Sequence, residues 1–136
     1  MHQKRVEAFL KIAAEELEAA RRLQAPLPRQ AEYFLQQSVE KLLRAVLEIE
    51  EIPAGVGHGL ASLAHLLPPS HIWRDRFKTF DHLSAASTMY RYPGPGGRLV
   101  SVSAEEVMAE LKQVEALDRE IRLYCADRLS GKGIGR

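Results

Sequence analysis

The sequence predicts an all-α protein, an up-and-down helical bundle of four long helices and one short helix. Apolar residues recur at spacings of three and four along most of the 136 residues, which is typical of amphipathic helices. No stretch shows the strict alternation of a strand, and prolines and glycines gather between the periodic stretches, where loops are expected. A chain of this length fits one domain, expected over residues 1–130, with residues 131–136 as a flexible tail.

Two long helices are expected at the start of the chain. The first covers about residues 2–23, and Pro26 and Pro28 follow it, because proline cannot continue a helix. The second runs from residue 29 or 30 to about residue 50. Their buried faces are predicted to hold Val6, Leu10, Ala13, Leu17 and Ala20 in the first, and Leu35, Val39, Leu42, Val46 and Ile49 in the second. The short connection predicts antiparallel packing.

The middle of the chain predicts the short helix and then a long one. The short helix is expected over His58–Leu67, and Pro68 and Pro69 end it. Ser70 is the expected N-cap of a long helix that continues to about residue 90. One face of this helix should carry Trp73, Phe77, Phe80, Ser84 and Ser87. Residues 91–102, with two Pro-Gly steps, are expected to form a loop.

The last long helix has a clear start signal. Ser103 and Glu106 have the spacing of a capping box, in which each side chain bonds the backbone amide of the other residue. The helix is expected to end near Leu129. Its apolar stripe is predicted to hold Val107, Leu111, Val114, Leu117, Ile121 and Cys125, with the single cysteine as inert core.

Charge and hydropathy exclude some functions. Lys and Arg number 19 against 18 Asp and Glu, so the net charge of +1 gives no bulk attraction to nucleic acid. No apolar run approaches the roughly 20 residues that span a bilayer, and the first residues have no apolar signal-peptide core. We therefore expect a cytoplasmic protein without membrane contact.

Three segments in a fixed order carry a family resemblance. Gln36–Lys41, then His58–Leu60 beyond one loop, then Arg91–Pro93 at the end of a later helix together resemble the HEPN domain family, over about residues 2–129. The resemblance implies a helical bundle that often dimerises. Small members of the family frequently accompany a minimal nucleotidyltransferase as half of a two-gene module. The family name refers to proposed nucleotide binding, and many members are ribonucleases of toxin–antitoxin or antiviral systems.

The ribonuclease branch of the family uses an Arg followed by a His after four to six residues. Arg76 and His82 have this spacing, although Phe77 is apolar where a polar residue usually follows the Arg. In such a site His is the acid or base and Arg stabilises phosphate charge. On a continuous helix, six residues leave the two side chains about 120° from a common face. A site across a dimer interface would escape that objection.

A second candidate site is a phosphate-binding cluster. Gln37, Lys41 and Arg44 share a helical face, and His58 and Arg91 are candidates to complete a ligand-binding set. The alternative is a solvated face on which Arg44 pairs with Glu40. No metal or cofactor is expected, since the histidines lack the carboxylate or thiolate companions of a zinc site.

The leading hypothesis is a binding protein without strong catalysis. It would form a homodimer and associate with a minimal nucleotidyltransferase encoded nearby, in a toxin–antitoxin-like module. The first alternative is a metal-independent ribonuclease toxin that uses Arg76 and His82 at a dimer interface, with RNA as its substrate. The second is a small nucleotide-sensing module centred on Lys41 and Arg44.

Overall fold

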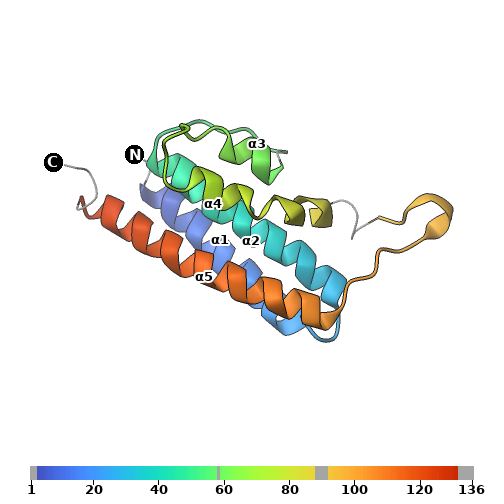
Figure 1. Cartoon of the computed structure of the whole chain (residues 1–136). Helices are drawn as coiled ribbons and strands as arrows, with labels where there is room; N and C mark the ends of the chain where they lie inside the picture. The colour runs from blue at the N-terminus through green and yellow to red at the C-terminus, as the bar shows by residue number, and fades with distance from the viewer. Residues whose placement is uncertain (1–2, 58, 88–91, 132–136) are drawn as a thin grey trace.

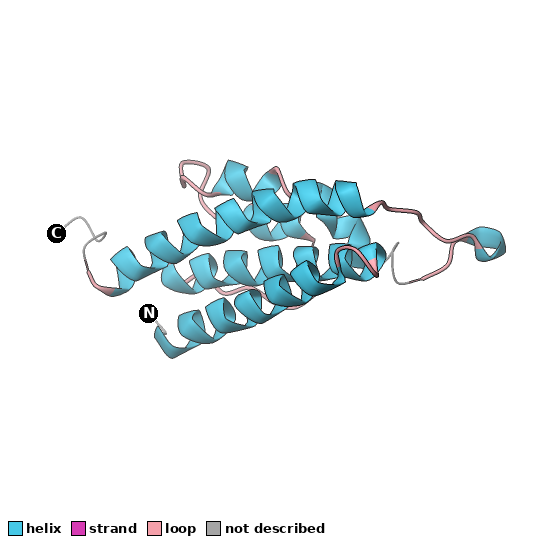
Figure 2. Cartoon of the chain, turned by 90° about the horizontal axis from the view of Figure 1, so that it is seen from below, coloured by secondary structure: helices cyan, strands magenta, loops and turns pink. Residues whose placement is uncertain are grey.

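The fold, seen in a computed structural model that describes residues 3–57, 59–87 and 92–131, is all-helical over these ranges. Three long helices, α1 (Gln3–Leu23), α2 (Pro28–Ile49) and α5 (Ala104–Leu129), lie side by side and form the body of the molecule (Figure 1). The second view shows the same body, with the segment before α5 projecting from one end (Figure 2). The all-α class predicted from periodicity is therefore confirmed.

Helix α2 is the central element of the bundle. It contacts α1, α5 and the segment that precedes the projecting loop, so most of its residues are buried. Its pairing with α1 is antiparallel, as the short connection predicted (Figure 1). Ser38 donates a hydrogen bond of 2.8 Å to the Ala13 carbonyl across this pair, in a fully buried position. The small side chains at this contact allow the two backbones to approach closely.

The prediction of a fourth long helix is wrong. The chain forms instead α4 (Arg74–Lys78) and a 3₁₀ helix, η1 (Asp81–Ser87), and the N-cap position of α4 is Trp73 rather than Ser70. Thr79 donates a side-chain hydrogen bond of 2.6 Å to the Arg76 carbonyl. Such local bonds compete with the helical ladder.

The buried residues in this segment explain the tighter winding. Phe77, Phe80 and Leu83 are all buried and lie three residues apart. The Phe80 amide bonds the Phe77 carbonyl at 3.0 Å, and the Leu83 amide bonds the Phe80 carbonyl at 2.9 Å. This i to i+3 pattern is that of a 3₁₀ helix, in which residues three apart lie above one another. The three apolar side chains therefore reach the core in a row.

Helix α3 (Leu60–Ala64) is shorter than the predicted His58–Leu67, and its start is capped from a distant segment. The Leu60 amide donates to Ser84 Oγ at 3.0 Å, and the Ala61 amide donates to Asp81 Oδ1 at 2.9 Å. Both acceptors belong to η1. The side chains of η1 therefore accept hydrogen bonds from two amides at the start of α3, where a helix has no partners of its own for them.

The remaining elements of the structure agree closely with those predicted from the sequence. Over the described residues 92–102 the expected loop contains one 3₁₀ turn, η2 (Pro95–Gly97), with positive φ at Gly96 and Gly97. The capping box before α5 is confirmed, with Glu106 N–H to Ser103 Oγ at 3.1 Å and Ser103 N–H to Glu106 Oε1 at 3.2 Å. The whole predicted apolar stripe of α5 is buried.

Two further expectations concern the chain ends and membranes. The proposed tail lies outside the described residues, apart from Gly131, which forms a turn after α5. None of the described helices combines the length and apolar character that crossing a bilayer requires.

Candidate functional site

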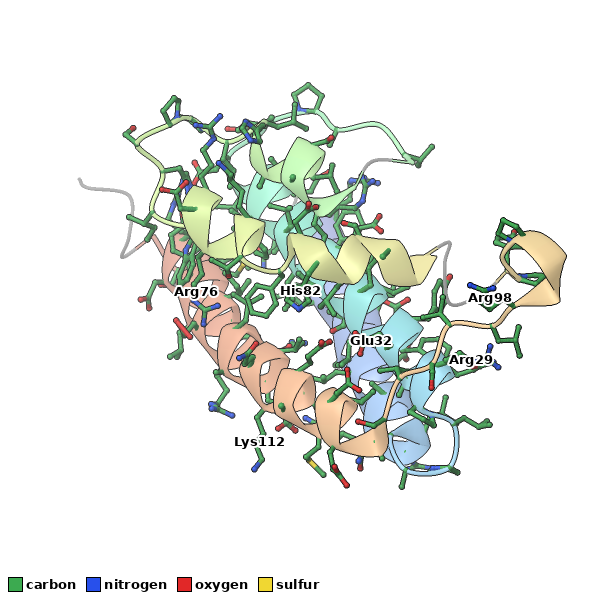
Figure 3. All side chains as sticks on the ribbon, turned by 45° about the vertical axis from the view of Figure 1, so that its right-hand side comes forward. Arg29, Glu32, Arg76, His82, Arg98 and Lys112 are labelled. Carbon is green, nitrogen blue, oxygen red and sulfur yellow. The ribbon has the colours of Figure 1, made fainter. Side chains whose placement is uncertain are left out.

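Arg76 and His82 both face α5, because α4 ends and η1 begins between them (Figure 3). Arg76 Nη2 lies 2.9 Å from Glu120 Oε2, and its guanidinium stacks 5.3 Å above the Phe80 ring. His82 Nε2 lies 3.7 Å from Glu110 Oε1, while its Nδ1 lies 3.2 Å from the Thr79 carbonyl oxygen. The separation of about 120° expected on a continuous helix therefore does not apply.

The two side chains are nevertheless held at separate points. Their partners Glu110 and Glu120 are ten residues apart on α5, or about 15 Å along a helix that rises about 1.5 Å per residue. One phosphate group is too small to contact Arg76 and His82 while both keep these partners. Each side chain would also have to leave a carboxylate before binding RNA.

A pair of carboxyl groups, buried Glu32 and partly buried Glu110, lies between α2 and α5 near His82 (Figure 3). Burial raises the pKa of Glu32 to about 9, and the hydrogen bond with Glu110 and the charges of Glu110 and Glu106 add to the shift. Glu32 is therefore protonated at neutral pH. Over the described residues, neither Glu32 Oε2 nor Glu110 Oε2 has a hydrogen-bond partner.

The sequence held a signal for this pair. Glu32 lies three residues before Leu35, and Leu35 lies four before Val39, so Glu32 continues the spacing of three and four that marks the buried face of α2. A glutamate on such a stripe is only 3% exposed here. A carboxyl group in that position must be neutral or paired.

The proposed phosphate-binding residues of α2 are held by carboxylates and by one another. Lys41 Nζ lies 3.4 Å from Glu16 Oε1 on α1 and 3.3 Å from Gln37 Oε1. Arg44 Nε lies 2.9 Å from Glu40 Oε2, which is the intrahelical pair that the spacing predicted. The other two proposed members, His58 and Arg91, lie outside the described residues.

The alternative prediction, a solvated face of α2, also needs correction. It is wrong because the Lys41 side chain is only 18% exposed and that of Arg44 only 9%. Burial raises the pKa of Glu16, and the charge of Lys41 opposes that shift. The cluster is therefore a half-buried set of ion pairs between α1 and α2.

A network of four polar side chains, which the sequence reasoning missed, ties the end of α2 to the end of α5. Glu50 Oε2 lies 2.8 Å from His71 Nε2 and 2.7 Å from Arg128 Nη1. It also accepts a short hydrogen bond from the Tyr124 hydroxyl. The Trp73 amide donates to His71 Nδ1 at 3.2 Å, so the chain before α4 is held by the same network.

The electrostatics of this network favour a structural role. Burial alone would raise the pKa of Glu50, but the hydrogen bonds from Arg128, Tyr124 and His71 lower it to about 2. Burial and the neighbouring Glu50 raise the pKa of Tyr124 to about 12. A phenol that keeps its proton so firmly is a poor nucleophile, and burial likewise raises the pKa of the Cys125 thiol to about 12.

Two adjoining cavities, of about 400 and about 430 Å³, lie at the opposite end of the bundle, where α1 turns into α2. We call them together the corner groove, and they share Arg29, Gln30 and Leu99. The groove is lined by Pro26, Leu27, Pro28, Arg29, Gln30, Tyr33, Phe34, Tyr92, Pro93, Leu99, Val100, Ser101 and Val102. Among the described residues, neither lining includes an acidic side chain. The sequence reasoning did not identify this feature, because it forms only where residues 92–102 cross the α1–α2 turn.

Metal ligands do not gather in the described ranges, which hold no cluster of three or more His, Cys, Asp or Glu arranged to bind an ion. His65 lies beside a cation, with its Nδ1 2.9 Å from Arg74 Nη2.

The helix arrangement and the sequence together define a small all-α domain. The profile of the HEPN domain family matches residues 6–122, most of the chain. The chain therefore belongs to the HEPN domain family, which confirms the resemblance stated above. No curated protein matched the chain, and no solved structure matched it.

Proposed function

We propose that this HEPN domain protein acts by binding rather than by catalysis, as the partner of a minimal nucleotidyltransferase in a two-gene, toxin–antitoxin-like module. One observation supports the binding role. Each candidate phosphate-contacting residue in the described ranges, apart from Gln37, already faces a carboxylate of its own chain: Arg76 with Glu120, His82 with Glu110, Lys41 with Glu16 and Arg44 with Glu40.

Two features of the protein oppose phosphate binding at these positions. A phosphate at any of these positions would meet a carboxylate and would have to displace it, which leaves a partly buried negative charge without its cation. The overall charge of +1 adds little attraction for a polyanion. A protein partner needs no such displacement, because it can bind the surface between the pairs.

Exposed apolar side chains support association with another chain. Leu123 on α5 is 68% exposed, and Ile12 on α1 and Met108 on α5 are each 39% exposed. Homodimers commonly bury such leftover apolar surface against a second copy. We propose a homodimer in the absence of the nucleotidyltransferase.

Size-exclusion chromatography with light scattering tests this function. The chain is measured alone and after co-expression with the product of the nucleotidyltransferase gene encoded beside it. We expect a dimer alone and a larger, co-eluting complex with the neighbour. A strict monomer in both samples contradicts the dimer and the partner together.

A metal-independent ribonuclease is the second candidate, favoured by the position of Arg76 and His82 on one side of the molecule (Figure 3). Their side chains are 33% and 50% exposed, so a second subunit could bring an Arg76 beside a His82. Total RNA is incubated with the pure protein in EDTA, beside His82→Ala and Arg76→Ala. Cleavage lost in both variants supports a nuclease, and equal cleavage or none removes this candidate.

A further inference from the structure

The corner groove combines apolar walls with a guanidinium group, that of Arg29. Leu27, Tyr92 and Leu99 are 51%, 59% and 58% exposed, although all three are large and apolar or aromatic. Burying such surface is the main driving force of association. The walls are already in place at the α1–α2 turn, so a ligand does not have to open them.

Two guanidinium groups stand at this end of the bundle. Arg29 lines both cavities, and Figure 3 shows Arg98, which belongs to the projecting loop, on the same side of the molecule. In the part of the chain that the structure describes, neither has a carboxylate within 4.0 Å. The residues outside the described ranges include no aspartate or glutamate. These two cations differ in this respect from Arg76, Lys41 and Arg44, which are all paired.

The shape of the groove distinguishes between classes of ligand. Sites for small molecules usually enclose most of the ligand surface. Here three of the apolar and aromatic lining residues, Leu27, Tyr92 and Leu99, are more than half exposed, so the groove is open to solvent along these side chains. An extended peptide fits such a surface, because its successive side chains point to opposite sides, so that one set can contact apolar side chains while the other set reaches the guanidinium groups.

We propose that the corner groove docks an extended segment of a partner protein, in which carboxylates alternate with aliphatic side chains. The aliphatic side chains contact Leu27 and Leu99, and the carboxylates pair with Arg29 and Arg98. This site rests on the proposed function as a partner-binding protein, and it names the chemistry of the segment that binds.

Selection from a random peptide library tests the chemistry without knowledge of the partner. Displayed twelve-residue peptides are selected on the immobilised full chain and sequenced. We expect enrichment of peptides with excess Asp and Glu beside Leu, Ile or Val, and affinities that fall as salt is raised. Enriched peptides without acidic excess, or no enrichment above the starting library, overturn the proposal.

Charge reversal locates the binding site. The double variant R29E/R98E should weaken the selected peptides at least tenfold, whereas K112E/R119E should leave their affinity unchanged. The control pair makes the same change in net charge at exposed positions of α5. Glutamate at position 29 suits the first turn of α2, because negative charge is favourable at a helix N-terminus, so R29E should fold. Equal loss in both double variants, or in neither, overturns the proposal.

A neutral variant separates charge from shape. L99S removes an exposed apolar side chain without a change in charge, and it should also weaken the selected peptides about tenfold. Circular dichroism and a melting curve check that each variant is folded. Unchanged affinity in folded L99S contradicts the apolar half of the proposed contact.

The other occupants give distinct outcomes. ATP or AMP binding that is lost in R29E/R98E would make the groove a nucleotide site, and conversion of a dimer into a monomer would make it a contact between copies. Either outcome overturns the peptide proposal.

The co-expressed nucleotidyltransferase separates this inference from the proposed function. If the nucleotidyltransferase binds the wild type and R29E/R98E equally, only the inference about the groove fails. If the nucleotidyltransferase does not bind but acidic peptides do, only the proposed function fails.

Discussion

Arg128 donates a hydrogen bond from Nη1 to Glu50 Oε2 at 2.7 Å, which ties the last turn of α5 to the residue that follows α2. The two residues are 78 positions apart in the sequence. Their contact closes the end of the bundle opposite the corner groove. His71 and Tyr124 bond the same carboxylate, so one ionised group holds three segments together.

The first prediction concerns the acid stability that Glu50 provides. Because the folded-state pKa is lowered to about 2, ionised Glu50 stabilises the fold above its ordinary pKa of 4.5. This contribution is lost as pH falls from 4.5 towards 2. We expect Glu50→Gln to lower the free energy of unfolding at pH 7 by about 1–2 kcal/mol, after allowance for partial exposure to solvent.

Urea unfolding at pH 7 and pH 2.5 measures this effect. The difference between wild type and Glu50→Gln should shrink at the lower pH, where the wild-type carboxylate is partly protonated. Glu15→Gln, at an exposed position on α1, is the control and should change stability little at either pH. A difference that stays constant with pH would show that the charge of Glu50 is not the stabilising feature.

The second prediction has the opposite sign and concerns Glu32. Its folded-state pKa is raised to about 9, so above pH 4.5 the unfolded chain ionises this group while the folded chain keeps it protonated. The wild type should therefore lose stability as pH rises from 4.5 to 9. Glu32→Gln cannot ionise, and its amide can still donate to Glu110, so we expect it to be more stable by about 1–3 kcal/mol at pH 8.

Melting temperatures of wild type and Glu32→Gln between pH 4 and pH 9 measure this gain. The curves should meet near pH 4 and separate as pH rises. If Glu32→Gln is less stable than wild type at pH 8, Glu32 does not keep its proton in the folded protein.

The long helices could be predicted from sequence because one local signal determines each of them. In α5 the capping box and a stripe of apolar residues every three or four positions lie within the same 26-residue helix. The segment with Phe77, Phe80 and Leu83 could not be predicted in this way, because steps of three suit both an α-helix and a 3₁₀ helix. Side-chain bonds of Thr79, Asp81 and Ser84 favour the tighter form here, and two of these depend on α3.

Contacts between site residues could likewise be predicted only where both residues lie on one helix. The pair of Glu40 and Arg44 was predictable because four residues on one helix determine the distance. Lys41 and Glu16 lie on different helices, and spacing within α2 contains no information about α1. Glu32 is the exception, since its place on an apolar stripe indicates burial without knowledge of Glu110.

The third prediction concerns the cap that η1 provides for α3. Asp81→Ala removes the acceptor of the Ala61 amide, and losses of a helix cap typically cost about 0.5–2 kcal/mol. We expect faster hydrogen exchange at Ala61 and its neighbour Leu60, with little change in α1. Asp75→Ala is the control, because this carboxylate is 90% exposed and lies 4.0 Å from Lys78. Equal exchange in both variants would exclude Asp81 as the cap.

The fourth prediction asks whether Lys41 binds a ligand or stabilises the fold. Lys41→Met leaves Glu16 half-buried without its cation, and the removal of one partner of such a pair costs about 1–3 kcal/mol. We expect a loss in this range at pH 8 and a smaller one at pH 4, where Glu16 takes up a proton. Glu16→Gln in the Lys41→Met background should recover part of the loss, because it removes the uncompensated charge.

Isothermal titration with ATP, GTP and AMP should give no heat that depends on Lys41. Nucleotide binding that disappears in Lys41→Met, together with unchanged stability, would instead make Lys41 a ligand-binding residue.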